Sequence, residues 1–301
     1  MAGHPAHWFD GVEMELRVSL SGEDAAISAL DQFAGVAMIR GEIILRSREE
    51  YWTVPAAAEA VHRYLEATCS RFAGKPVWYR LADLWSDEVA TLAGEPGTEL
   101  EHNPIIGLRG TERMMRSGPA REVELGILSD LASRFGNLHV LAPFIHDAAE
   151  FAGFAEEMSV RRWPNRLGSM IEIPAAVVDA GAIVAAGASN LFVGLNDLTS
   201  LSLGRERGPP ELKLHHAVWA AIDTVAAAAA GRAEWGVGGS LSAELLDRIE
   251  AAGAHYAALH YSELPELLGV ERGQLPDAGF VREVKARTRA ARARLAERRV
   301  S

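Results

Sequence analysis

Short apolar runs alternate with amphipathic, helix-like stretches along most of this 301-residue chain. Eight runs have the length of buried strands and cover residues 15–20, 35–39, 76–81, 105–109, 139–143, 169–173, 190–194 and 234–238. Helical patterns separate most of them, including residues 55–72, 119–135 and 147–158. A strand followed by a helix, repeated eight times, predicts an α/β fold of the (β/α)₈ TIM barrel type. An open doubly wound sheet is the alternative, but no glycine-rich dinucleotide turn follows the first strand.

The size and composition of the chain suit one barrel-sized domain. Hydrophobic residues make up 49% of the sequence, which is enough to bury a large core. We predict an N-terminal extension over residues 1–12, the barrel over residues 13–275 and a basic C-terminal helix over residues 276–301. After Phe280 that helix has no aromatic residues between its charges, so we expect it to pack on the acidic domain rather than to bind nucleic acid.

Charge and cysteine content exclude several classes of protein. The formal charge of −11 at pH 7 argues against nucleic acid as a partner. Cys69 is the single cysteine, so neither an internal disulfide nor a thiolate metal cluster can form, which points to a reducing compartment. No secretory signal opens the sequence, and no uncharged apolar run approaches the length of about 20 residues that spans a membrane. These features predict a soluble, cytoplasmic protein that has no membrane contact.

Two carboxylates follow neighbouring apolar runs. Glu172 lies at the end of the run 169–173, and Asp197 follows the run 190–194. The Ala- and Val-rich segment 175–188 between them fits the crossover helix of a parallel strand–helix–strand unit. The carboxyl ends of both strands then face one rim, where α/β folds bind ligands. Glu172 and Asp197 are therefore predicted ligands of Mg²⁺, with Mn²⁺ as an alternative.

Other polar side chains lie at or just after the ends of the predicted strands. Arginine presents fixed donors that fit carboxylate and phosphate, so several arginines around Mg²⁺ predict a small ligand with two or three negative charges. His146, after the run 139–143, is a predicted general acid or base. The rest of the predicted rim consists of Arg40, Arg80, Asp83, Arg109, Asn196, Arg207 and Gly238.

The motifs that hold these residues resemble, in the same order, the signatures of the phosphoenolpyruvate-utilising enzymes. That family includes phosphoenolpyruvate (PEP) synthase, pyruvate phosphate dikinase and enzyme I of the sugar phosphotransferase system. The resemblance runs from residue 13 to residue 270. Its segments are GVAMIRGE at 35–42, RLAD at 80–83, NPIIGLRG at 103–110 with Arg113, MIEIP at 170–174 and NDLTSLSLGRER at 196–207.

The resemblance implies a site for PEP or pyruvate with Mg²⁺ at the C-terminal rim of the barrel. By motif position, Glu172 and Asp197 would bind the metal and Asn196 would contact the phosphate. The arginines would hold phosphate and carboxylate, with Asp83 and Gly238 completing the substrate site; these arginines are Arg40, Arg80, Arg109 and Arg207. Arg40, Arg109 and His146 are the predicted catalytic residues. The family also implies a homodimer.

Two departures from the family concern the reaction. The last strand of these enzymes normally carries a cysteine that exchanges a proton with C3 of the enolate, whereas the matching segment here has Gly238. Cys69 falls within a predicted helix and does not replace it. The mobile phosphohistidine domain and the nucleotide-binding domain have no counterpart in the chain, so we expect either a separate phosphohistidine carrier protein or a different reaction on the same ligand.

Three functions therefore remain open from the sequence. The first, which is the one we predict, is a Mg²⁺-dependent PEP or pyruvate enzyme that transfers a phosphoryl group with a carrier or acceptor in trans. The second is a metal-dependent 2-oxoacid lyase or aldolase that works through a pyruvate enolate. The third is a metabolite-binding homologue without catalysis, against which the cost of so many polar rim residues argues.

Overall fold

Eight strands pair in parallel with their neighbours in chain order, and the last strand pairs with the first, which closes the sheet. The computed structural model describes residues 12–23, 28–269, 271 and 279–300. The strands are β1 (Glu15–Leu20), β2 (Val36–Arg40), β3 (Val77–Arg80), β4 (Leu138–Ala142), β5 (Leu167–Ile171), β6 (Asn190–Gly194), β7 (Glu234–Gly238) and β8 (Tyr256–Leu259). This topology, with helices between the strands, confirms the predicted (β/α)₈ barrel.

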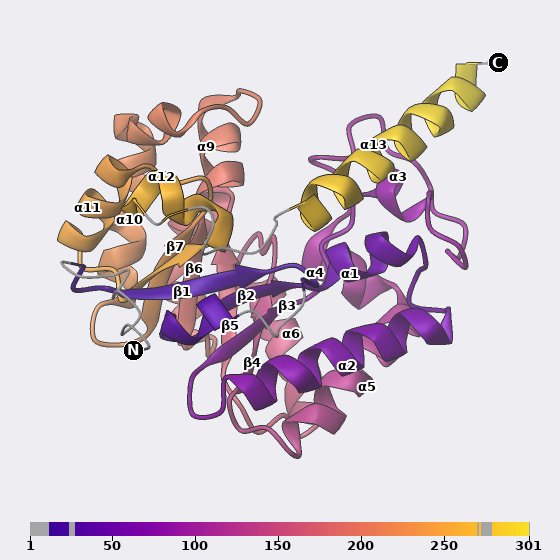
Figure 1. Ribbon diagram of the computed structural model, residues 1–301, viewed down its shortest axis with the longest axis horizontal. Coiled ribbons are helices and arrows are strands. Elements are labelled where there is room, and N and C mark those ends of the chain that lie inside the picture. Colours follow the sequence, from indigo (N-terminus) through magenta and orange to yellow (C-terminus); the bar gives the residue numbers. More distant parts are fainter. Residues whose placement is uncertain (1–11, 24–27, 270, 272–278, 301) are drawn as a thin grey trace.

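Helices follow the strands and cover the outside of the barrel (Figure 1). They are α1 (Gly41–Arg48), α2 (Pro55–Arg71), α3 (Ser86–Val89), α4 (Gly110–Arg116), α5 (Gly118–Ala132), α6 (Ala148–Val160), α7 (Pro174–Val178), α8 (Ala180–Ala185), α9 (Leu195–Leu203), α10 (His216–Ala229), α11 (Ala243–Ala251), α12 (Leu264–Leu268) and α13 (Gly279–Val300). Short 3₁₀ turns lie at η1 (Ser28–Gln32), η2 (Pro210–Leu214) and η3 (Tyr261–Glu263). None of the helices in the described part of the chain is long and apolar enough to cross a membrane.

The core has two layers, because the strands are buried on both faces. One layer joins the outward side chains of the strands to the helices. The other fills the inside of the barrel with large side chains set against small ones, namely Trp78, Leu141, Met170, Phe192 and Tyr256 with Ala37 and Ala258. The barrel is therefore a packed core rather than a pore.

Ion pairs close the end of the barrel where the strands begin. Arg17 on β1 pairs with Glu234 on β7, and its guanidinium lies 4.2 Å from the centre of the Tyr256 ring. Arg166 also pairs with Glu234, at 2.9 Å. Because these ion pairs fill the end where the strands begin, the open space of the barrel lies at the carboxyl ends of the strands.

One predicted strand is wrong, and one observed strand was missed. Residues 105–109 form an irregular loop, and Ile105 and Ile106 are 39% and 63% exposed, so this apolar run is not a buried strand. The missing strand is β8, whose four residues include two alanines and give little hydrophobic signal. Gly238 consequently ends the seventh strand, and Arg109 precedes α4 rather than ending a strand.

The predicted crossover helix at 175–188 is divided into two helices. The break is at Asp179, which lies between α7 and α8. Its side chain accepts a hydrogen bond from the backbone N–H of Ala148, 2.8 Å away at the start of α6. The connection still joins two adjacent parallel strands, β5 and β6, as predicted.

The basic C-terminal segment forms the long helix α13, which packs against α1 and α3 (Figure 1). Val281 and Val284 are buried, and Thr288 accepts a 3.0 Å hydrogen bond from Arg46 of α1. The packing on the domain follows the prediction, whereas the part of α13 in the wall of the central cavity was not foreseen. The N-terminal extension lies almost wholly outside the described residues, and the predicted domain limits stay a prediction.

Candidate functional site

A cavity of about 990 Å³ opens at the carboxyl ends of the strands. Nine of the ten residues predicted for the rim line it, although the strand count that led to them was partly wrong. These nine are Arg40, Arg80, Asp83, Arg109, Glu172, Asn196, Asp197, Arg207 and Gly238. The cavity therefore brings together residues from β2 to β7 and from the loops that follow them.

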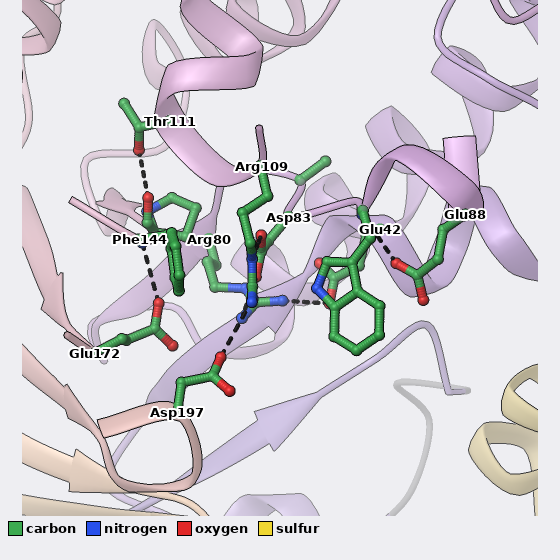
Figure 2. A network of polar contacts seen from close by, with 12 residues as sticks. Glu42, Arg80, Asp83, Glu88, Arg109, Thr111, Phe144, Glu172 and Asp197 are labelled. Carbon is green, nitrogen blue, oxygen red and sulfur yellow. Dashed lines mark hydrogen bonds and ion pairs between the residues drawn. The ribbon is translucent and has the colours of Figure 1, made fainter. Parts of the chain in front are cut away.

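The two predicted metal ligands come from adjacent strands. Glu172 follows the last residue of β5, and Asp197 lies in the first turn of α9, directly after β6. The backbone N–H of Phe144 donates to Oε2 of Glu172 at 3.0 Å (Figure 2). A Cβ atom built on Gly194 would lie 2.6 Å from Oε1 of Glu172, so only glycine leaves room for this carboxylate. The room for the Glu172 carboxylate therefore depends on the glycine at position 194.

Electrostatics at this pair favour a bound cation. Burial, followed by the negative charges of Asp197 and Asp83, raises the pKa of the Glu172 carboxyl above its usual value. A divalent cation would relieve this repulsion, and Mg²⁺ needs only one or two protein carboxylates. Within the described residues, no set of three or more His, Cys, Asp or Glu side chains gathers to hold a metal. The residues present thus fit Mg²⁺ as a two-carboxylate site whose other ligands come from substrate and water.

Arg109 is held rigidly between two acids (Figure 2). Its Nε and Nη2 donate to the two oxygens of Asp83 at 2.9 and 2.5 Å, and Nη2 also reaches Oδ2 of Asp197 at 3.2 Å. Burial alone would raise the pKa of Asp83, but the charge and hydrogen bonds of Arg109 outweigh it and lower that pKa. Asp83 is therefore a positioning residue for Arg109 in this structure, and its contact with substrate stays a prediction.

Phe144 supports the same arginine in an unusual backbone conformation. Its φ angle of 54° lies in the left-handed region, which non-glycine residues rarely adopt. The guanidinium of Arg109 lies 4.1 Å from the centre of its ring, a cation–π contact. Thr111 donates a 2.7 Å hydrogen bond to the preceding carbonyl, that of Pro143, and fixes this turn (Figure 2). One turn thus positions both Glu172 and Arg109.

The other rim arginines differ in whether an acidic side chain forms an ion pair with them. Arg80 pairs with Glu42, and Arg207 pairs with Oδ1 of Asp197. Arg40 donates to the hydroxyl of Ser21, and its buried Nε has no hydrogen-bond partner. Among the described residues, Arg40 forms no ion pair with an acid. It is therefore the rim arginine with the most free capacity for an anionic ligand.

Phe192 occupies the space above Gly238. A Cβ atom built on Gly238 would collide with the tip of the Phe192 ring, with Cε1 at 2.9 Å, and would lie 3.2 Å from Cβ of Ala258. A cysteine cannot stand at this position unless Phe192 moves. Asn196, the predicted phosphate contact, accepts a long hydrogen bond of 3.4 Å from the N–H of Ser240 in the adjoining loop.

His146 lies apart from the other predicted residues. It is not among the cavity-lining residues of the described chain, and its Nδ1 is 2.9 Å from Oε2 of Glu150, one turn along the chain. The hydrogen bond with Glu150 raises the pKa of His146. Its role as an acid or base stays a prediction, which this placement does not favour.

Several residues of the site were not predicted to take part. Glu42 was part of a quoted motif, and its place two residues after Arg40 signalled an acid near the rim. His260 is a weaker acid or base candidate than His146 in the sequence; it directly follows β8, lines the cavity and pairs with Glu23 at 2.9 Å. Phe192 reads as an ordinary core residue in the sequence, and nothing in its pattern signals the contact with Gly238.

Comparison with known families and curated proteins gives a consistent result. The profile of a family described as "PEP-utilising enzyme, PEP-binding domain" matches residues 2–246. A multiphosphoryl transfer protein of Xanthomonas campestris is 30% identical over 257 residues, which cover 80% of this chain and 29% of that protein. A phosphoenolpyruvate synthase of Pyrococcus furiosus is 24% identical, with coverage of 69% and 26%. The chain thus spans less than a third of the length of these relatives.

Solved structures share the barrel at much lower identity. A HpcH/HpaI aldolase/citrate lyase family protein from Burkholderia cenocepacia has a TM-score of 0.52 and 16% identity, with 86% of this chain and 92% of that chain covered. Protein CitE from Mycobacterium tuberculosis, solved with magnesium and acetate, has a TM-score of 0.50 and 16% identity, with coverage of 90% and 97%. At this identity the likeness concerns the fold alone.

Proposed function

Because this chain belongs to the PEP-utilising enzymes, as a PEP-binding domain, we propose that it is a Mg²⁺-dependent enzyme that binds PEP or pyruvate at the rim cavity. The reaction in this proposal is phosphoryl transfer between that ligand and an acceptor or phosphohistidine carrier supplied in trans. The supporting observation is the buried pair Glu172 and Asp197, which lies beside Arg109 and opens on the same cavity as Arg40. A homodimer belongs to the same proposal on family grounds.

Glu172 and Asp197 would hold the Mg²⁺ ion in this proposal. When bound, the ion supplies two positive charges next to the anionic oxygens of the ligand. The protein residues then mainly position groups and offset charge, which is what phosphoryl transfer requires. Asp83 and Phe144 keep Arg109 in one orientation, so its charge faces the ligand without reorganisation.

Two arginines are suited to bind the ligand directly. Arg40 has a buried, unpartnered nitrogen at the cavity, and a phosphate or carboxylate oxygen would satisfy it. The Arg207 side chain is 49% exposed and reaches Asp197 from the loop after α9, so it can turn from this carboxylate to an incoming anion. Together they would complete the positive surroundings of the ligand.

The aromatic ring above Gly238 favours one alternative, a 2-oxoacid lyase. In that reaction the hydroxyl group of a hydroxy-oxoacid loses a proton to water, the carbon–carbon bond breaks to give a carbonyl compound and the pyruvate enolate, and water returns a proton to C3 in place of the absent thiol. Phe192 occupies the position of such a thiol and leaves an apolar surface there. Release of pyruvate from a panel of hydroxy-oxoacids would favour the lyase, whereas loss of PEP measured by ³¹P NMR would favour phosphoryl transfer.

Calorimetry with Mg²⁺ and oxalate, a mimic of the pyruvate enolate, tests the proposed site. The wild-type protein is expected to bind oxalate only when Mg²⁺ is present. Glu172→Gln should lose this binding by at least about tenfold, or 1.4 kcal/mol, because one ligand charge is gone. Glu157→Gln, the same change on the outer helix α6, is the matched control. Absence of Mg²⁺-dependent binding of both oxalate and PEP to the intact wild type would refute the proposal.

A further inference from the structure

Helix α13 forms one wall of the cavity. Six of its residues line the space, and they recur about once per turn along one side of the helix: Val281, Arg282, Lys285, Thr288, Arg289 and Arg292. Arg292 holds the helix against the segment that follows β3, because it pairs with Asp87 and lies 4.9 Å from the ring centre of Trp85. This wall is absent from the motifs that define the PEP site, since it lies beyond residue 246, where the family match ends.

Some of the charged side chains that line the cavity form ion pairs with one another, and others do not. Nine Lys and Arg side chains and seven Asp and Glu side chains face it, in a chain whose formal charge is −11. The pairs that neutralise each other are Arg80 with Glu42, Arg109 with Asp83, Arg207 with Asp197 and Arg46 with Glu88. Three cations have no acidic partner among the described residues: Arg40 of β2, and Lys285 and Arg289 of α13.

These three cations line the same cavity, one from β2 and two from α13. Lys285 and Arg289 are four residues apart, so their side chains lie on the same face of α13. Partial desolvation, followed by the positive charges of Arg40, Arg46 and Arg207, lowers the pKa of the Lys285 amine. The amine is therefore close enough to the rim arginines to feel their charge. Glu42 offsets part of this repulsion at Lys285 and Arg40, and an anion between α13 and Arg40 would offset more of it.

The size of the cavity is consistent with more than one small ligand. Its volume of about 990 Å³ lies at the upper end of the range for small-molecule sites, and a three-carbon acid would fill only part of it. The metal pair occupies the side of β5 and β6, whereas α13 packs against α1 and α3. The part of the cavity next to α13 is therefore lined by charged side chains other than those of the metal pair.

We propose that Lys285 and Arg289 of α13, together with Arg40 in the same cavity, form a second anion subsite that binds a phosphate or carboxylate group of the second substrate. The inference deepens the proposed function, on which it rests for the identity of the first ligand. It makes the acceptor an anionic small molecule that enters the cavity, rather than a neutral alcohol or water. Both an acidic and a phosphorylated acceptor share the chemistry that these cations recognise.

Calorimetric titration of sulfate tests this subsite in the full-length protein saturated with Mg²⁺ and oxalate, with chloride holding the ionic strength constant. The wild type is expected to bind one sulfate. The double variant Lys285→Gln/Arg289→Gln should bind it about tenfold more weakly, while its affinity for Mg²⁺ and oxalate changes much less. Arg294→Gln, an exposed arginine of α13 outside the cavity lining, is the matched control and should behave as the wild type. A parallel titration with acetate distinguishes a carboxylate from a tetrahedral anion.

The outcomes separate this inference from the proposed function. Sulfate or acetate binding that the double variant loses and Arg294→Gln keeps supports the subsite, even if Mg²⁺-dependent oxalate binding fails. Oxalate binding without any sulfate or acetate binding overturns the subsite and leaves the proposed function standing. Equal anion affinity in the wild type and the double variant also overturns it.

Discussion

Because of Glu124, the wild-type protein is expected to lose stability as the pH rises. The variant Glu124→Gln should not show this loss. Glu124 lies on α5 and is 2% exposed. Its Oε1 accepts hydrogen bonds from the Tyr79 hydroxyl and the Ala82 N–H, both at 2.8 Å. Burial, with a smaller contribution from the charge of Glu42, raises the pKa of this carboxyl to about 7. Proton binding by this side chain is therefore linked to folding.

The direction and size of the effect follow from that pKa. In the unfolded chain the carboxyl titrates near its ordinary pKa of 4.5, so the folded state holds the proton more tightly between 4.5 and about 7. The stability contributed by protonated Glu124 is complete below pH 4.5 and is lost as the pH rises through about 7. The difference of about 2.5 pH units corresponds to about 3 kcal/mol.

Urea unfolding near pH 4.5 and near pH 8 measures this contribution. Glu124→Gln keeps an acceptor oxygen for Tyr79 and Ala82 but does not ionise. Between the two pH values, its free energy of unfolding should rise by about 3 kcal/mol relative to the wild type. Glu156→Gln, at an exposed position of α6, is the control and should follow the wild type. The reasoning would be refuted if the difference in free energy of unfolding between Glu124→Gln and the wild type changed by less than about 1 kcal/mol between the two pH values.

Two further predictions concern packing and charge at the rim. Gly238→Cys is expected to destabilise the protein by about 1–3 kcal/mol, because the new side chain overlaps Phe192. Thermal unfolding of Gly238→Cys/Phe192→Ala should show a smaller cost than the sum of the single changes, and strict additivity would contradict the steric account. Asp83→Ala should cost about 3–5 kcal/mol in urea unfolding, because it leaves Arg109 buried without its bidentate partner. The double variant Asp83→Ala/Arg109→Met should recover part of that loss, and no recovery would argue against the ion pair as the cause.

The placement of Glu172 and Asp197 at one rim could be predicted from the sequence, because it depends only on how two strands that are adjacent in the chain are connected. Parallel strands that are adjacent in the chain and joined by a helical crossover place their carboxyl ends on one rim. The prediction survived the break of the crossover at Asp179, since two short helices return the chain as well as one. The same rule placed Arg40 and Arg80 correctly.

Arg109 reached the rim for a reason other than the predicted one. Apolar content suggested a strand at residues 105–109, but Ile105 and Ile106 are largely exposed and Arg109 is positioned by Asp83 and Phe144. Periodicity reports burial only on average, so it does not separate an exposed apolar loop from a short strand. Contacts between distant segments, such as that of Phe192 with Gly238, depend on side-chain shape and have no signature in the local sequence.

The contact between Phe192 and Gly238 also constrains the order in which substitutions can accumulate. A cysteine introduced first at position 238 meets the aromatic ring, whereas a smaller side chain introduced first at position 192 leaves a hole but no collision. A mutational path to a thiol at this rim therefore begins on β6, one strand away from the residue that would carry the sulfur. For anyone who selects new activities in this barrel, libraries that vary position 238 alone will sample destabilised proteins, whereas paired libraries at positions 192 and 238 can avoid the collision.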